Sequence, residues 1–301
     1  MTEIVPRPRR DRFALVRPLG RGGTAETWLA KREGGLFPEE VCIKRSLRSM
    51  NRDDRRALLE EARLLARVRH ANVVQLLEGC EDQAGDVFLV LELVRGVDLR
   101  VLSRALASRG RVFRPAVVAA IAMYLCRALA AAQRAVPGGL VHRDVTPHNV
   151  LVSREGEIKL ADFGIARAFD REPWTRAGLV KGKTGFFSPE QLRGDALDVR
   201  SDLFAVGIIA FELLVGHRPL IEHGTEIELR VAECQAALSR LGPAIPLGLS
   251  DAVASLLAAE RSDRPATADA AARLLSGFTD EQRALDELRQ YVADVCGAAS
   301  Y

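Results

Sequence analysis

Short apolar runs and one longer amphipathic segment make up the chain as far as about Glu92. The runs are rich in β-branched and aromatic residues and end at turn residues, which predicts strands. In the longer segment, apolar residues return every three or four positions, which predicts a helix over 53–70 with one core-facing side. The expected strands are 12–20, 27–33, 39–46, 73–81 and 86–94.

The pattern changes after Glu92, where longer apolar segments predict a mainly helical part. Ser201 or Asp202 is the expected cap of one helix, and Gly277 is expected to end another. Two short strands predict a hairpin around Gly156. The expected helices are 115–135, 201–216, 266–278 and 280–297, and the expected hairpin strands are 150–153 and 157–162.

Composition narrows the classes of protein that fit this pattern. The 301 residues are 48% hydrophobic, which is enough for one large domain or two lobes with separate cores. The net charge of +3 is too small to indicate a nucleic-acid partner. Residues 1–12 contain a basic stretch and are expected to form a flexible, solvated arm, with a docking tail as the alternative.

The cysteines and the apolar stretches indicate in which compartment of the cell the protein is expected. Five scattered cysteines without a CxxC pair argue against a disulfide framework or a zinc site and favour a reducing compartment, so we expect a cytoplasmic protein. The first ten residues lack the apolar run of a signal peptide. Residues 203–216 are too short to span a bilayer and contain Glu212, so no membrane span is expected.

Candidate chemistry begins with the stretch HRDVTPHN at residues 142–149. An aspartate and an asparagine five positions apart, Asp144 and Asn149, suit a base and a metal ligand in phosphoryl transfer. Asp162, which follows a strand, can supply a second oxygen ligand for Mg²⁺. The glycine-rich segment 19–31 could cradle phosphates, although a plain hairpin turn has the same composition.

Two ion pairs are also expected from the pattern. Lys44 lies in an apolar strand and needs an anionic partner if it points inward, which Glu61 on the predicted helix could provide. Two unrelated surface charges are the alternative for this pair. Glu190 in SPEQ and Arg264 in RSDRP could form a buried pair within the helical part.

These motifs together, in this order, resemble the eukaryotic-type protein kinases and in particular their bacterial serine/threonine branch. The resemblance covers roughly residues 12–278. It implies an α+β, bilobal fold with a small, mainly β N-lobe (13–92) containing one key helix and a larger, mainly helical C-lobe (93–278). Residues 279–301 would then be a helical extension.

The resemblance also implies roles for single residues. Lys44, oriented by Glu61, would hold the α- and β-phosphates of ATP. Asp144 would accept the proton of the substrate hydroxyl, and Asn149 and Asp162 would bind Mg²⁺, for which Mn²⁺ could substitute. The implied nucleotide-binding residues are Leu19, Gly20, Arg21, Gly22, Gly23, Thr24, Ala25, Thr27, Cys42, Lys44, Leu91, Glu92, Val94, Asp98 and Leu151.

Structural roles are implied for a further set of residues. Asp202 would brace the backbone of the Asp144 loop, and His142 would be structural rather than catalytic. The implied stacked core consists of Leu65, Leu76, His142 and Phe163.

The chain departs from the family pattern at four positions. Ala25 and Thr27 replace a glycine and an apolar residue beside the nucleotide. Thr146 stands where many kinases have a lysine, and Lys183 stands where they have a threonine. We expect that Lys183 supplies the missing cation and Thr146 the missing hydroxyl; the alternative is that Lys183 points to solvent.

The implied activity is transfer of the γ-phosphate of ATP to serine or threonine of a protein substrate, together with autophosphorylation. A pseudokinase scaffold and a small-molecule phosphotransferase are the alternatives. Arg143 would receive a phosphate from Thr175, unless the segment is ordered without phosphate. Binding of a regulatory protein partner and formation of a homodimer are both compatible with the sequence.

Overall fold

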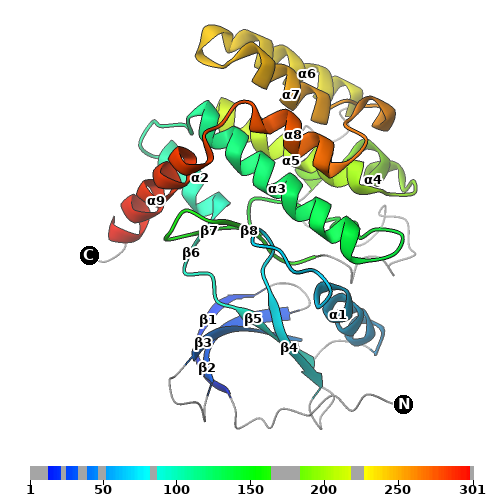
Figure 1. Cartoon of the computed structure of the whole chain (residues 1–301), viewed down its shortest axis with the longest axis vertical. Coiled ribbons are helices and arrows are strands. Elements are labelled where there is room, and N and C mark those ends of the chain that lie inside the picture. Colours follow the sequence, from blue (N-terminus) through cyan, green and yellow to red (C-terminus); the bar gives the residue numbers. More distant parts are fainter. Residues whose placement is uncertain are drawn as a thin grey trace. The chain divides into compact units, whose positions relative to one another are not determined.

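A computed structural model of the chain describes residues 13–21, 25–32, 39–46, 52–81, 87–163, 184–217 and 227–298 (Figure 1). The described residues fall into two compact units. The first contains the described residues up to 69 together with 74–94, and the second contains 70–73, 95–163 and those from 184 onward. An antiparallel sheet dominates the first unit and helices dominate the second, which confirms the predicted fold class.

The first unit is a five-stranded antiparallel sheet with one helix, α1 (Arg52–Leu65). All five predicted strands and the predicted helix are present, although the helix ends earlier than 70. In spatial order the strands are β1 (Phe13–Arg21), β2 (Ala25–Arg32), β3 (Glu39–Ser46), β5 (Val87–Glu92) and β4 (Leu76–Glu81).

The two faces of this sheet carry different side chains. On one face, a core cluster joins Ala30, Val41, Ile43 and Val90. Alternation along β3 places Cys42 and Lys44 on the opposite face. Helix α1 packs on that opposite face, because a Cβ at Gly79 would lie 3.5 Å from Leu89, the cross-strand partner of Lys44, and 3.8 Å from Ala62. The helix that carries Glu61 therefore covers the face that carries Lys44.

The second unit is built around α3 (Pro115–Ala135), which has a proline in its first turn as predicted. It contacts α5 (Val199–Val215) and α8 (Ala268–Ser276). Among the described residues, α3 is the helix that is long and apolar enough to cross a membrane, but 83% of its apolar window is buried inside the protein. Such burial is typical of a core helix, and α3 has this role here.

A small sheet in the second unit carries several candidate site residues. It has the order β6 (Gly96–Asp98), β7 (Val150–Ser153) and β8 (Ile158–Leu160), all antiparallel. Strands β7 and β8 form the predicted hairpin. The backbone N–H of Arg154 donates to the carbonyl of Arg95 at 2.8 Å, which extends the pairing of β6 with β7 by one residue pair.

The remaining helices surround this framework. In the described residues these helices are α2 (Leu99–Ala107), α4 (Pro189–Arg193), α6 (Ile227–Arg240), α7 (Leu247–Leu256) and α9 (Glu281–Ala298). Short 3₁₀ helices occur at Thr184–Phe186, Gly242–Ala244 and Arg261–Asp263. The predicted cap of α5 was wrong: the helix begins at Val199, and the Asp198 side chain accepts the N–H of Arg200 at 2.8 Å. Asp202 is instead used inside the fold.

Candidate active site

The loop that precedes β7 is held by Asp202 of α5. Its carboxylate accepts the backbone N–H groups of His142 at 2.7 Å and Arg143 at 2.8 Å, which confirms its predicted bracing role. Burial raises the pKa of Asp202 to about 7, although both backbone N–H groups act in the opposite direction. Arg143 has φ 68°, a conformation that non-glycine residues rarely adopt. The brace therefore stabilises a strained backbone next to Asp144.

Asp144 and Asn149 contact each other within this loop. The Nδ2 group of Asn149 donates to the Asp144 backbone carbonyl at 2.8 Å and to its carboxylate Oδ2 at 3.1 Å. Both residues are 8% exposed. The Asn149 amide thus orients the Asp144 carboxylate, the predicted catalytic base.

His142 has a structural role, as expected. Its Nδ1 accepts the backbone N–H of Asp144 at 3.2 Å, so we assign the ring proton to Nε2, which lies 3.0 Å from the carbonyl of Ala161. The ring also packs on Phe163, with 4.5 Å between the centroids. The Asp144 loop and the segment after β8 are thereby fastened to one another.

The two candidate metal ligands flank the β7–β8 hairpin. Asn149 directly precedes β7, and Asp162 lies two residues after β8. The backbone N–H of Ala161 donates to the carbonyl of Asn149 at 2.8 Å, so the two ends of the hairpin are in contact. Asp162 has φ 57°, a second positive φ at a non-glycine residue.

This pair of oxygen-bearing side chains fits Mg²⁺. Magnesium takes one or two protein ligands and completes its shell with phosphate oxygens and water. Because the hydrogen bonds of the Asn149 amide use Nδ2, its side-chain oxygen is the atom suited to a metal. The described residues contain no cluster of three or more His, Cys, Asp or Glu side chains that would form a metal cage of its own.

Glu190 and Arg264 form the predicted buried pair. Two hydrogen bonds of 2.7 and 3.0 Å join the guanidinium to the carboxylate, and both residues are at most 3% exposed. Ser201 donates a further bond to Glu190 at 2.7 Å. Burial alone would raise the pKa of Glu190, but the hydrogen bonds from Arg264 and Ser201 outweigh it and lower the pKa.

Gln191, which sequence reasoning missed, links this pair to the catalytic loop. Its Nε2 donates to the backbone carbonyl of Arg143 at 3.2 Å. Its side chain and that of Ser188 also cap α4 reciprocally, a capping box. The pattern Ser-x-x-Gln is a readable sequence signature for such a cap, but not for the bond to Arg143.

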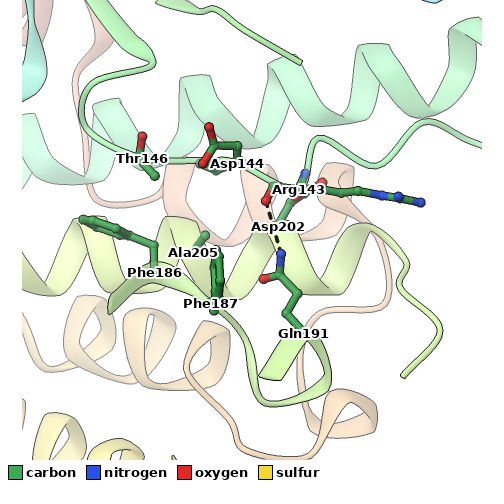
Figure 2. Close-up of a pocket in the computed structure, with 9 residues that line it drawn as sticks. Arg143, Asp144, Thr146, Phe186, Phe187, Gln191, Asp202 and Ala205 are labelled. Atoms are coloured by element: carbon green, nitrogen blue, oxygen red, sulfur yellow. Dashed lines mark hydrogen bonds between the residues drawn. The ribbon is translucent and has the colours of Figure 1, made fainter. Parts of the chain in front are cut away.

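A small pocket lies beside Asp144 (Figure 2). Its lining residues are Arg143, Asp144, Val145, Thr146, Phe186, Phe187, Gln191, Asp202 and Ala205. Thr146 is 2% exposed, and its hydroxyl has no hydrogen-bond partner in the part of the chain that the structure describes. Figure 2 shows that hydroxyl pointing away from the rings of Phe186 and Phe187. Lys183 lies outside the described residues, so its predicted role beside Thr146 stays a prediction.

In the first unit, several predicted nucleotide-binding residues share one face of the sheet. Lys44 pairs with Thr27 on β2 and Leu89 on β5, and Cys42 pairs with Leu91. Cross-strand partners point to the same side, so Thr27, Cys42, Lys44 and Leu91 lie on one face. The Glu61 side chain is outside the described set, and the Lys44–Glu61 pair therefore stays a prediction.

The glycine-rich segment is described only at its two ends. Leu19, Gly20 and Arg21 end the exposed strand β1, and Ala25 begins β2. The hydroxyl of Thr27 donates to the Gly20 carbonyl at 3.2 Å across the hairpin. Gly22, Gly23 and Thr24 lie outside the described residues.

The segment after β5 constrains how adenine could bind. The backbone N–H of Glu92 donates to the carbonyl of Gln75 at 3.0 Å. A contact of Glu92 with adenine would therefore have to come from its carbonyl. Val94 follows β5 and is partly buried.

Asp98 has a structural partner as well as its predicted ribose role. Its Oδ1 accepts the N–H of Val101 at 2.7 Å and caps α2. The other oxygen lies 3.8 Å from Nδ1 of His148. Leu151 is the β7 partner of Asp98, so both lie on the small sheet whose strand β7 directly follows Asn149.

The protein kinase domain family matches residues 13–274. The chain belongs to the protein kinase family. The kinase domain of Mycobacterium tuberculosis PknI has a similar solved structure, with a TM-score of 0.66, 25% sequence identity, and coverage of 89% of this chain and 96% of that one. Both findings agree with the fold described above.

This chain matches a portion of each curated relative. Serine/threonine-protein kinase PknL of Mycobacterium tuberculosis is 38% identical over 76% of this chain and 56% of its own length. Tyrosine-protein kinase MasK of Myxococcus xanthus is 35% identical over 89% of this chain and 43% of its own length. The chain thus spans about half the length of the curated relatives it matches.

Proposed function

We propose that the chain is an ATP- and Mg²⁺-dependent serine/threonine protein kinase that also phosphorylates itself. The observation that carries this proposal is the Asp144 loop. The Asp144 carboxylate is oriented by Asn149, and the backbone beside it is fixed by Asp202. A buried, oriented carboxylate that can accept the proton of a substrate hydroxyl is what a protein kinase needs as its base.

The roles of the other residues follow from their positions within each unit. In the first unit Lys44 holds the α- and β-phosphates of ATP, and Glu61 on α1 orients it. In the second unit the side-chain oxygens of Asn149 and Asp162 hold Mg²⁺, which neutralises phosphate charge when bound. The nearness of the two ends of the β7–β8 hairpin supports the metal assignment, and Mn²⁺ has the same preference for oxygen ligands.

The acceptor is proposed to be serine or threonine. The catalytic loop HRDVTPHN lacks the alanine- and arginine-rich pattern of tyrosine kinases. PknL is named a serine/threonine kinase, whereas MasK is named a tyrosine kinase. Tyrosine is therefore the alternative that an experiment must be able to detect.

The buried Glu190–Arg264 pair supports a protein substrate over a small molecule. Small-molecule phosphotransferases with related folds lack an SPE segment tied to a distant arginine, and this chain has both parts. We further propose a cytoplasmic location and input from a soluble protein partner or a second copy of the chain. Thr175 as an activating phosphosite stays a prediction, because it lies outside the described residues.

Phosphotransfer by the purified chain tests the proposal. With radiolabelled ATP, Mg²⁺ and a generic basic protein, we expect labelled phosphoserine or phosphothreonine in acid hydrolysates. Asp144→Asn should lower labelling by about 10²- to 10⁴-fold, the usual contribution of a catalytic base, and Lys44→Ala should also lower it by orders of magnitude. Asp251→Asn, on the exposed side of α7, is the matched control and should label normally.

Other outcomes would select the alternatives. Nucleotide binding without turnover in the wild type would indicate a pseudokinase. Labelled phosphotyrosine would assign a tyrosine acceptor. Wild-type labelling by Asp144→Asn would exclude Asp144 as the base.

A further inference from the structure

Helix α9 lies beyond the part of the chain that matches the kinase family. The family match ends at residue 274, and α9 begins at Glu281. Within the second unit α9 contacts α2, α3, β6 and β7. Figure 1 shows it alongside α2, next to the β6–β7–β8 sheet. The helix is therefore an addition that reaches the elements around the candidate site.

One side of α9 is packed into the second unit. Ala284, Leu288, Tyr291 and Val292 recur at helical spacing and are 0–5% exposed. Tyr291 meets Phe113 edge to face, with ring centroids 5.6 Å apart. Residues on the opposite side, such as Arg283 and Asp286, are polar and exposed. This pattern is typical of an amphipathic helix that is docked by one face, here over residues 284–292.

Polar contacts fix the position of α9 at both ends. At its start, Glu281 accepts two bonds from Arg127 of α3, at 2.7 and 2.8 Å, and one from the Tyr124 hydroxyl at 3.0 Å. Arg127 holds the pKa of Glu281 below its usual range, so the carboxylate is charged at neutral pH. Near its end, Arg109 donates to the backbone carbonyl of Asp294 at 3.2 Å.

Helix α9 closely approaches the turn of the β7–β8 hairpin. Gly156 has φ +85°, and a Cβ built there would lie 2.2 Å from the carbonyl oxygen of Leu285 and 3.1 Å from the N–H nitrogen of Arg289. Both neighbours are α9 backbone atoms, which cannot rotate away as a flexible side chain could. The hairpin turn is therefore pressed directly against the helix.

This hairpin carries the candidate metal ligands. Asn149 and Asp162 lie at its open end, Leu151 lies within β7, and Asp98 lies on the neighbouring strand β6. The Ala161–Asn149 backbone bond couples the two sides of the open end. We expect a displacement of the turn to reach the ligands along the two short strands, because the strands are paired over their length.

We propose that α9 is a positioning element for the Mg²⁺–nucleotide site, acting through Gly156 and Leu285 at the hairpin turn and through the Glu281–Arg127 anchor. The inference rests on the proposed kinase function. Magnesium demands near-ideal octahedral geometry, so its binding responds to small shifts of the two ligands. Residues that orient metal ligands commonly change metal affinity by about 10- to 100-fold when they are replaced.

Gly156→Ala and Gly138→Ala form a matched pair for the test. Both glycines have φ +85°, but a Cβ at Gly138 meets nothing within 4 Å. Each alanine therefore has to adopt the same positive φ, and only Gly156→Ala collides with α9. In the full chain with saturating AMP-PNP, we expect Mn²⁺ binding, followed by the electron paramagnetic resonance of free Mn²⁺, to weaken about tenfold in Gly156→Ala relative to Gly138→Ala.

A second pair removes the anchor without touching the hairpin. Arg127→Met removes the two guanidinium bonds from α3 to Glu281 and leaves the bond from Tyr124, whereas Arg134→Met, on the same helix, removes an exposed bond to Asp269 of α8. Arg127→Met should weaken Mn²⁺ binding and speed amide hydrogen exchange in residues 150–160, and Arg134→Met should do neither. If Gly156→Ala fails to fold, this pair decides the question.

The outcomes separate the two proposals. If the wild type binds no Mn²⁺ with the nucleotide analogue, or does not phosphorylate protein, the proposed kinase function fails. If the wild type is active and binds Mn²⁺, but both pairs show equal affinities within each pair, the function stands and α9 has no positioning role.

Discussion

The Asp144 loop and the β1–β2 hairpin both carry candidate site residues, but they hold them by different means. In the loop, the exposed fractions of Asp144, Thr146 and Asn149 are 2–8%. Asp202, which braces the loop backbone, is also buried, with an exposed fraction of 2%. In the hairpin every residue of β1 from Leu15 to Arg21 is exposed. Its cross-strand side-chain bond, from Thr27 to the Gly20 carbonyl, is also exposed.

This difference has an energetic consequence. When a buried hydrogen-bonding group loses its partner, the remaining group stays out of water and the fold is destabilised by the full desolvation term. When an exposed group loses its partner, water replaces it. We therefore expect substitutions around the loop to have large effects on stability or turnover, and substitutions in the hairpin to have small ones.

The largest stability effect is expected at Arg264. Arg264→Met leaves the Glu190 carboxylate buried and without its cation, which should lower the free energy of unfolding by about 3–5 kcal/mol. Urea denaturation measures the change. Arg193→Met is the matched control, because the Arg193–Asp195 pair is also short, at 2.9 Å, but about half exposed. The control should change stability by less than about 1 kcal/mol.

Equal losses in the two arginine variants would contradict the comparison. Burial would then not distinguish the loop region from the surface. Glu190→Leu combined with Arg264→Met gives a further check, since replacing both partners should recover part of the loss.

The next largest effect, on turnover, is expected around Thr146, whose buried hydroxyl has no hydrogen-bond partner among the described residues. We expect Lys183→Ala to lower kcat by about 10²-fold or more with a small change in the KM for ATP, if Lys183 supplies a cation felt mainly in the transition state. Thr146→Lys with Lys183→Thr should recover much of that loss, and neither single change should. Steady-state kinetics of the four proteins measures the coupling. Wild-type turnover by Lys183→Ala would make Lys183 a surface lysine.

The sequence indicated which residues of the loop belong together, because these residues are close in the chain, and their roles as base and metal ligand stay predictions. Asp144 and Asn149 are five residues apart, and the structure joins them by two hydrogen bonds. The Glu190–Arg264 pair was predicted from motif order despite its long separation. These features depend on residue types at particular positions, which the sequence states directly.

Contacts between distant elements could not be predicted in this way. The bond from Gln191 to the Arg143 carbonyl and the contact of Gly156 with α9 depend on tertiary packing, for which periodicity gives no signal. Helices α2, α6 and α7 were missed, and α4 is too short for a periodic pattern. The cap of α5 was misassigned because Asp198, Ser201 and Asp202 are all good capping residues, and only packing selects Asp198.

A pH-dependent effect is expected from Asp202. Burial raises its pKa from 3.8 to about 7, so the folded protein keeps a proton that the unfolded chain releases near pH 4. The stabilising contribution of this group therefore falls as pH rises from about 4 to 7. Asp202→Asn does not titrate, so the stability advantage of the wild type over this variant should shrink across that window, by up to about 1 kcal/mol per pH unit. Parallel urea-denaturation profiles from pH 5 to 8 would show that Asp202 titrates normally.

The smallest effect is expected in the hairpin, at Thr27. Thr27→Val removes the exposed bond to the Gly20 carbonyl, and water can replace it, so the free energy of unfolding should change by less than about 0.5 kcal/mol. The added methyl lies on the face that carries Cys42 and Lys44, where it could meet adenine. The KM for ATP should then fall about fourfold, the value of one buried methyl-sized group. Thr27→Ser, which keeps the hydroxyl and loses the methyl, should shift the KM in the opposite direction. Urea denaturation and steady-state kinetics of both variants test this, and a stability loss above about 1 kcal/mol in Thr27→Val would mean that the hairpin, like the loop, depends on its side-chain bond.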